Sequence, residues 1–267
     1  MKRNTMAALA LWGILTGSAG AVGNTADVTV HDRAENRTLP VYQHQGRHYV
    51  VGRPGSEYQV RVRNRSGSDI LAVVSVDGVN AVSGETADWS QSGYVLAPGQ
   101  GFDIKGWRKS LQRVAAFFFT EHQNSYAART GRPDNVGVIG VAVFRRKYEP
   151  DVRILRDRLS GERRESPAEP QGGAGASADD APRGAESDAR RQAPSTVEKS
   201  TSLGTGHGRS ETSRVTYTQF ERATPHPEEV IAIHYDTHAN LVAMGVIRGP
   251  RIATPSPFPG QFVPDPR

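Results

Sequence analysis

Four histidines near the end of the sequence have side chains that could bind a metal ion or act as a catalytic base. His234 and His238 are four positions apart, the spacing with which a helix presents two imidazoles to one zinc ion. The surrounding pattern instead predicts a strand entering a turn, where such residues lie more than about 10 Å apart at the usual rise of about 3.3 Å per residue. Tyr235 also stands where the zinc-protease motif H-E-x-x-H requires glutamate. We interpret these two histidines, with His207 and His226, as scattered polar residues and expect no bound metal or other cofactor.

A hydrolase is the enzymatic alternative. It requires His207, His234 and an acidic residue such as Asp236 to converge with a nucleophile or a metal ion in one cleft. The sequence contains no G-x-S-x-G segment, which carries the nucleophilic serine in many hydrolases, and it has no cysteine. A non-enzymatic protein is therefore the first expectation, and a hydrolase with an unrecognised site is the second.

Two short glycine-containing segments resemble ligand-binding loops. The segment DGVN at 77–80 begins like a calcium loop but lacks the later acidic ligands, and Asp77-Gly78 is a preferred dipeptide of tight hairpin turns. The segment GTGHG at 204–208 could let the backbone approach a phosphate, but it lacks the lysine of a P-loop and opens no helix. We interpret the first segment as a hairpin turn and the second as the end of a linker.

Aromatic and arginine side chains in and near one long polar loop, residues 125–135, are the best candidates for ligand binding. Aromatic rings can stack on a sugar or a peptide, and guanidinium groups can bind an acidic group with two hydrogen bonds. The alternative is that the aromatic rings belong to the core and the arginines to the solvated surface. The predicted binding residues are Trp107, Arg108, Tyr126, Arg129 and Arg132.

Residues 1–21 have the features of a secretory signal peptide. Lys2 and Arg3 give a positive start, residues 6–15 are an unbroken apolar run, and small residues end the segment at Ala21. The apolar run is too short for a membrane span, which needs about 20 residues. We expect cleavage after Ala21, a periplasmic or secreted product, and no transmembrane segment after signal removal.

The composition limits the remaining functions. Lys+Arg 33 and Asp+Glu 28 nearly balance, and no basic cluster interleaved with aromatic residues marks a nucleic-acid surface. Hydrophobic residues make up 36% and aromatic residues 7% of the chain, which is low for a protein that is packed throughout. We expect part of the chain to be unfolded, no nucleic acid as partner, and an envelope protein or a glycan as the unknown partner.

Residues 26–150 have the pattern of a mainly β domain, an antiparallel two-sheet β-sandwich. Residues 58–63 alternate between apolar and polar, as in a strand with one face on a core. Residues 114–120 and 136–144 are apolar on both faces, so we expect these strands to be central. Turn dipeptides separate the short strands, and Gln45-Gly46 predicts a hairpin.

The rest of the chain is predicted to be a long disordered linker at 157–204, a C-terminal β segment at 213–248 and a Pro-rich tail at 249–267. Within the β segment, residues 229–236 and 241–247 read as a hairpin, and 215–220 as a further strand. Because an isolated hairpin is only marginally stable in water, we expect the segment to dock on the sandwich or on a partner.

Three stretches resemble a group of secreted proteobacterial proteins of uncharacterised activity. They are SVDG at 75–78, GWRKS at 106–110 and SYAARTGRPDNVGVIGVAVF at 125–144, and the resemblance covers most of 49–145. It implies export and a β architecture, and it carries no activity. The sequence as a whole predicts an exported non-enzymatic protein, an envelope binding or structural module.

Overall fold

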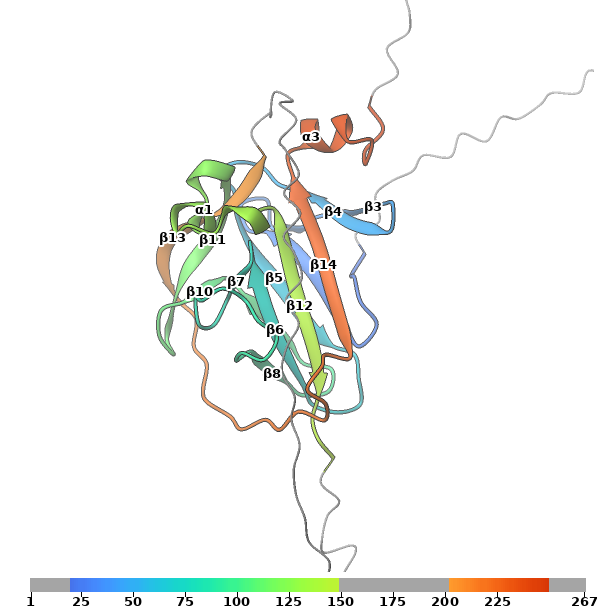
Figure 1. The fold of residues 1–267 in the computed structure, drawn as a ribbon, viewed down its shortest axis with the longest axis vertical. Helices are drawn as coiled ribbons and strands as arrows, with labels where there is room; N and C mark the ends of the chain where they lie inside the picture. Colours follow the sequence, from blue (N-terminus) through green and yellow to red (C-terminus); the bar gives the residue numbers. More distant parts are fainter. Residues whose placement is uncertain (1–19, 149–201, 250–267) are drawn as a thin grey trace, which may run out of the picture. The chain divides into compact units, whose positions relative to one another are not determined.

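The computed structural model describes residues 20–148 and 202–249. These residues form two seven-stranded sheets, and the side chains between the sheets make the main hydrophobic core (Figure 1). This arrangement confirms the predicted mainly β, two-sheet sandwich. No helix of the described part is long and apolar enough to span a bilayer.

The first sheet has the order β10-β11-β5-β1-β2, with β13 paired to β11 and β9 paired to β5. All its pairs are antiparallel. Its strands are β1 (Ala26–Asp32), β2 (Arg37–Thr38), β5 (Glu57–Asn64), β9 (Gly101–Ile104), β10 (Gly106–Arg108), β11 (Arg113–Glu121) and β13 (Leu203–Thr212).

The second sheet has the order β3-β4-β14-β12-β6-β7, with β8 paired to β6. Only one pair in the described sheets is parallel, that of β14 with β4. No hairpin joins these two strands, so no turn imposes an antiparallel direction on them. The strands are β3 (Val41–His44), β4 (Arg47–Val51), β6 (Ile70–Val76), β7 (Val79–Asn80), β8 (Tyr94–Leu96), β12 (Val138–Arg145) and β14 (Glu229–Asp236).

The apolar pattern of each strand matches its place. In β5, Tyr58, Val60 and Val62 are fully buried while Arg61 and Arg63 are exposed. β12 lies between β14 and β6, which confirms the central position expected from its two apolar faces. β11 is likewise flanked on both sides, by β13 on one and by β10 and β5 on the other.

A second, smaller core covers the outer face of the second sheet. It contains Leu71, Val73, Ala142 and Phe144, and Phe220 packs against it. Phe220 belongs to the segment that connects β13 in the first sheet with β14 in the second. This segment crosses one end of the sandwich, visible at the bottom of Figure 1.

Both predicted hairpin turns are confirmed. Gln45 and Gly46 join β3 to β4 with φ of 49° and 75°, and Asp77 and Gly78 join β6 to β7 with φ of 53° and 70°. Two successive positive φ values define the type I′ turn, whose twist suits two-residue hairpins. Asp-Gly is a preferred dipeptide of this turn, whereas at the other turn only Gly46 is a residue that favours positive φ.

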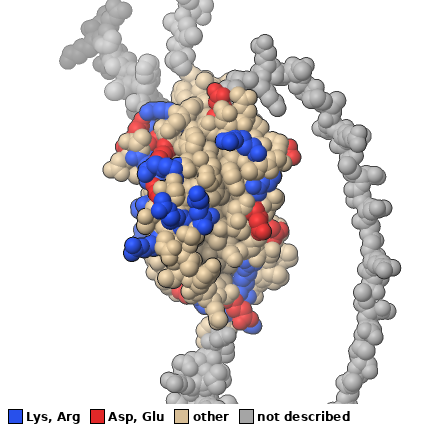
Figure 2. All heavy atoms as spheres, turned by 90° about the vertical axis from the view of Figure 1, so that its left-hand side faces the viewer, with Lys and Arg blue, Asp and Glu red and all other residues tan. Residues whose placement is uncertain are grey.

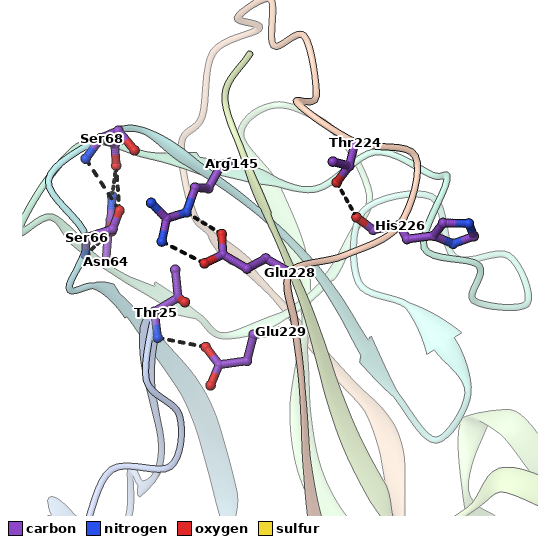
Figure 3. A network of polar contacts seen from close by, with 9 residues as sticks. All are labelled: Thr25, Asn64, Ser66, Ser68, Arg145, Thr224, His226, Glu228 and Glu229. Carbon is purple, nitrogen blue, oxygen red and sulfur yellow. Dashed lines mark hydrogen bonds and ion pairs between the residues drawn. The ribbon is translucent and has the colours of Figure 1, made fainter. Parts of the chain in front are cut away.

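The start of β14 is fixed by acidic side chains that reach two other parts of the chain (Figure 3). Arg145, the last residue of β12, donates two hydrogen bonds to the Glu228 carboxylate. The Glu229 carboxylate accepts from the backbone N–H groups of Asn24 and Thr25, at 2.6 and 2.8 Å. β14 is thus joined to the central strand and to the beginning of β1.

The predicted C-terminal hairpin is wrong in its second half. Residues 241–247 form no strand, because α3 (His238–Ala243) follows β14. Thr237 caps this helix by accepting a hydrogen bond from the Asn240 N–H at 3.2 Å, and Leu241 is its buried apolar residue. Residues 237–240, which would be the turn of that hairpin, instead start the helix with Thr237 as its cap.

Two other expectations for the C-terminal half need correction. Residues 215–220 contain no strand. Leu203 and Gly204, which we assigned to the end of the linker, begin β13. The predicted signal peptide up to residue 19, the linker from 157 to 201 and the tail from residue 250 lie outside the described residues.

Candidate functional site

The polar loop between β11 and β12 folds into three short helical turns. These are η1 (His122–Asn124), α1 (Tyr126–Arg129) and η2 (Pro133–Asn135). Ser125 organises the loop, because its fully buried hydroxyl donates to the His122 carbonyl at 2.7 Å and accepts from the Ala128 N–H at 3.2 Å. The serine therefore ends η1 and caps α1 with the same oxygen.

α1 and β13 enclose a cavity of about 270 Å³, here called the α1–β13 hollow. The rings of Tyr126 and His207 lie 5.3 Å apart with an angle of 34° between their planes. The residues that line the hollow are Asn124, Tyr126, Arg129, Thr130 and His207. Two of the five predicted binding residues, Tyr126 and Arg129, thus line one cavity.

The two arginines of the loop have different roles. Arg132 is held by the protein, since its guanidinium donates to the Gly84 carbonyl and the Thr130 hydroxyl and lies 5.8 Å from the centre of the Tyr126 ring. Arg129 is exposed, and its guanidinium makes no hydrogen bond or ion pair within the described residues. Arg129 is therefore the cation that is available to a ligand.

Trp107 is buried beneath the hollow and does not line it. Its side chain is 3% exposed, and its ring packs at 4.8 Å against both Phe117 and Tyr126. The indole plane is nearly parallel to the His207 ring, at 10° and a centroid distance of 6.4 Å. Trp107 therefore supports the two aromatic rings of the hollow from the core side.

Arg108 points away from the hollow and fixes the segment after β13. Its guanidinium donates to the Ser213 carbonyl at 2.6 Å, to the Ser213 hydroxyl at 2.9 Å and to the Tyr94 hydroxyl at 3.2 Å. Burial raises the pKa of Tyr94, and the charge of Arg108 opposes that rise. Arg108 is therefore already engaged within the protein.

The glycine-rich segment 204–208 is a strand whose glycines make room for neighbouring side chains. A Cβ atom on Gly206 would lie 2.2 Å from Cζ of Phe118, and one on Gly204 would lie 2.5 Å from Cβ of Ser125. The bare backbone lets the Phe118 ring lie across β13 and lets the start of α1 approach it. This close contact places His207 beside Tyr126.

A chain of buried polar groups lies behind β13. The hydroxyl of Thr205 is 2.6 Å from the hydroxyls of both Tyr58 and Tyr235, and the Tyr235 hydroxyl donates to the Asp77 carboxylate. Asp77 also accepts from the Thr205 N–H at 2.7 Å and from the Gly137 N–H at 2.9 Å. Its carboxylate is thus satisfied from three sides although the residue is fully buried.

Burial dominates the titration of this network. It raises the pKa of Asp77 to about 6, against the opposing effect of the hydrogen bonds from Tyr235, Gly137 and Thr205. Burial, followed by the charge of Asp77, raises the pKa of Tyr58 and Tyr235 well above the usual value. Sequence reasoning missed this role of Asp77, because the hairpin turn alone accounts for an aspartate there and its partners are far away in the chain.

Figure 2 shows the side of the molecule that lies to the left in Figure 1, where β10, β11, β13 and α1 are found. Lys and Arg side chains gather on this side, with acidic ones between them. The exposed basic residues on these elements and on the turn after β10 are Lys109, Arg113, Arg129 and Arg209. Of these, Arg209 is ion-paired with Glu57 and Glu211, whereas Arg129 lines the hollow itself.

No known family model, curated protein or solved structure matches this chain. Its function is therefore inferred from the side chains that the fold brings together.

The three residues of the hydrolase alternative do not share a cavity. His207 lines the α1–β13 hollow, whereas His234 lines a separate cavity of about 480 Å³ between β14, the β3–β4 hairpin and residues 21–24. Asp236 accepts from the N–H groups of Leu203 and Thr237 and from the Asn240 side chain, so it organises the junction of β14 and α3.

The histidines also do not form a metal site in the described part of the chain. No three His, Asp or Glu side chains of residues 20–148 and 202–249 gather closely enough to hold an ion. His234 lies in β14 and His238 in α3, so they are not on one helix. Burial, and to a lesser degree the charge of Arg47, lowers the pKa of His234, whose ring lies 5.4 Å from that of Tyr49.

Proposed function

We propose that this protein is an exported, non-enzymatic binding module and that the α1–β13 hollow binds an acidic sugar unit of a glycan. The observation that carries the proposal is the exposed Arg129 guanidinium beside the tilted pair of rings, Tyr126 and His207. A sugar ring can lie with its C–H groups against these aromatic faces. Its carboxylate can then accept two hydrogen bonds from Arg129.

The size and the rim of the hollow favour a sugar. A cavity of about 270 Å³ suits a single small ring, and Asn124 and Thr130 add amide and hydroxyl groups to its lining. These neutral groups can exchange hydrogen bonds with sugar hydroxyls. The hollow therefore offers an apolar face for the C–H groups of a uronic acid, a cation for its carboxylate and neutral polar groups for its hydroxyls.

Packing and hydrogen bonds hold the elements around the hollow in place, which favours binding. Trp107 packs under both rings, Arg132 ties the loop to the Gly84 carbonyl, and β13 is paired along its length with β11. Side chains that are already held in place lose little conformational entropy when a ligand binds. This preorganisation supports a binding site and requires no chemical step.

Export is supported by the order of features in residues 1–21 and is compatible with the start of the fold. Val22 forms a β-bridge in which its N–H donates to the Val28 carbonyl at 3.0 Å and its carbonyl accepts at 2.9 Å. Cleavage after Ala21 would leave this bridge intact, since an α-ammonium group is also a donor. The periplasm or the cell exterior is also where glycans of the envelope occur.

The test is a calorimetric titration of the protein with short oligogalacturonates and with neutral galactose oligomers of equal length. We expect the acidic oligomers to bind and Arg129→Gln to weaken them about ten-fold, the loss of a charge-assisted bond pair. Tyr126→Ala should weaken binding similarly, whereas Arg63→Gln, an exposed arginine of β5, is the matched control. Equal affinity for acidic and neutral oligomers, or equal effects of the two arginine variants, would overturn the proposal.

A further inference from the structure

We infer that Asp77 is a positioning residue of the α1–β13 hollow, whose carboxylate holds together the two chain segments that form its walls. The effect of Asp77 on ligand binding rests on the proposed function. The effect of Asp77 on the two chain segments can be tested in the ligand-free protein.

The two walls meet at the two oxygens of this one carboxylate. Oδ1 accepts from the N–H of Gly137, where the loop that carries Tyr126 and Arg129 ends. Oδ2 accepts from the N–H of Thr205, two positions before His207 on β13. A side chain with two acceptor atoms is needed to satisfy both amides.

The hairpin turn that contains Asp77 is itself docked on the loop. The Asp77 N–H donates to the Val138 carbonyl at 2.9 Å. A Cβ atom on Gly78 would lie 2.8 Å from Cβ of Asn135, so the turn and η2 are in close contact. The carboxylate is therefore held in position by its own backbone while it holds the two amides.

The hydroxyl chain allows Asp77 to take up a proton without releasing these amides. Tyr235, Thr205 and Tyr58 each have a hydroxyl that can donate or accept, and either oxygen of the pairs with Thr205 can be the donor. In the ionised state the chain donates toward Asp77. In the neutral state Asp77 donates to Tyr235 and the chain runs the other way, so both amide bonds can persist.

No cation faces this carboxylate in the described part of the chain. The groups that approach it are Tyr235 from β14, Tyr58 through Thr205 from β5 and β13, and the amides of Gly137 and Thr205. Desolvation is opposed only by hydrogen bonds, and it raises the pKa of Asp77 to about 6. The Asp77 carboxylate therefore gains or loses its proton at about pH 6, between the two chain segments that form the hollow.

Asp77→Asn tests whether a neutral amide side chain can replace a neutral aspartic acid at this position. An asparagine must direct its NH₂ group at one of the two backbone N–H donors, so one wall loses its bond. Tyr235→Phe is the matched variant, because it removes a hydroxyl from the chain and leaves both amide bonds to the carboxylate.

The experiment is an amide NMR titration of the ligand-free chain between pH 4 and 8. We expect the Gly137 and Thr205 signals of the wild type to shift with one common midpoint. Tyr235→Phe should move that midpoint and keep both signals, and Asp77→Asn should remove the pH dependence and displace one signal. Separate midpoints, or amides that do not respond to pH in this range, would overturn the inference even if Asp77→Asn fails to fold.

The binding readout distinguishes the two proposals. With oligogalacturonate as the probe, Asp77→Asn should weaken binding about ten-fold, and Tyr235→Phe should retain wild-type affinity at pH 7.5. If no acidic oligomer binds the wild type, the proposed function fails, while the amide titration still decides whether Asp77 joins the two chain segments. If the amides titrate together but Asp77→Asn binds as well as wild type, Asp77 does not position the hollow.

Discussion

The guanidinium carbon of Arg222 lies 4.3 Å from the centre of the Phe144 ring, on the outer face of the second sheet. Arg222 also donates to the Gln91 carbonyl at 2.6 Å. Desolvation lowers its pKa and the charge of Asp88 opposes this effect. This single side chain therefore covers the small outer core and ties the segment that leads to β14 to the loop before β8.

Replacing Arg222 by alanine should therefore destabilise the protein. Loss of the cation–π contact and of the hydrogen bond should lower the free energy of unfolding by about 1–2 kcal/mol, measured by urea denaturation. Arg214→Ala is the control, because Arg214 is exposed on the same crossing segment and has no partner in the described part of the chain. Equal effects of both substitutions would show that neither the contact with Phe144 nor the hydrogen bond to Gln91 contributes to stability.

Gly206→Ala should be costly because of the ring of Phe118. The new Cβ atom would lie 2.2 Å from Cζ of that ring, so the ring or the strand must move. We expect a loss of about 1–3 kcal/mol in the free energy of unfolding. Gly67→Ala is the control, since nothing lies within 4 Å of its Cβ position, and it should stay within about 0.5 kcal/mol of wild type.

The cause can be separated with a double-mutant cycle. Phe118→Ala removes the ring that Gly206→Ala would meet, so the glycine substitution should cost less in that background than in the wild type. An unchanged cost would place the strain in the backbone of β13 and not in this contact.

The contribution of Asp77 to the stability of the protein should increase as the pH falls from about 6 to 4. The pKa of Asp77 is about 6 in the folded state against 3.8 as its ordinary value, so the folded state holds a proton that the unfolded state has released. This stabilisation is complete below the unfolded value and is lost as the pH rises through about 6. It amounts to at most about 3 kcal/mol at 1.36 kcal/mol per pKa unit.

The measurement is a series of urea denaturations of the wild type and Asp77→Asn at pH 4 to 7. Other carboxylates act in both proteins, so the difference between the two curves reports Asp77. We expect this difference to change with pH across the stated window, and two parallel curves would contradict the raised pKa.

Local features of the fold could be predicted because local chemistry determines them. Asp77-Gly78 adopts positive φ at both positions, a requirement that this dipeptide meets by itself, and Gly46 meets it at the second position of the other turn. The alternation in β5 identifies its buried face without reference to its neighbours. The candidate loop could also be recognised, since two of its residues, Tyr126 and Arg129, do line a cavity.

Long-range relationships could not be predicted from these patterns. Trp107 and Arg108 are adjacent in the chain, but one is buried under the hollow and the other bonds Ser213, because neighbouring strand residues face opposite sides. His207 reaches Tyr126 through a glycine-rich segment that has no apolar pattern to mark it as a strand. The bond between Asp77 and Thr205 spans 128 positions, and periodicity says nothing about such pairs.

β14 should be indispensable for the fold of the N-terminal strands. It lies between β12 and β4, and its inward side chains Ile231, Ile233 and Tyr235 are at most 4% exposed. A chain of residues 22–148 would leave both neighbouring strand edges open and the core without these three side chains. We expect this fragment to show no cooperative urea transition, measured by far-UV circular dichroism.

Adding a separate peptide of residues 202–249 should restore the transition in a one-to-one complex, because that peptide supplies both β13 and β14. The same peptide with Ile233→Asp is the control, since a buried carboxylate at that position would have no partner and should prevent association. If residues 22–148 alone unfold at the urea midpoint of the whole chain, the N-terminal strands fold without β14 and the prediction is wrong. If they fold only with the unaltered peptide, the two segments of the chain form one cooperative core.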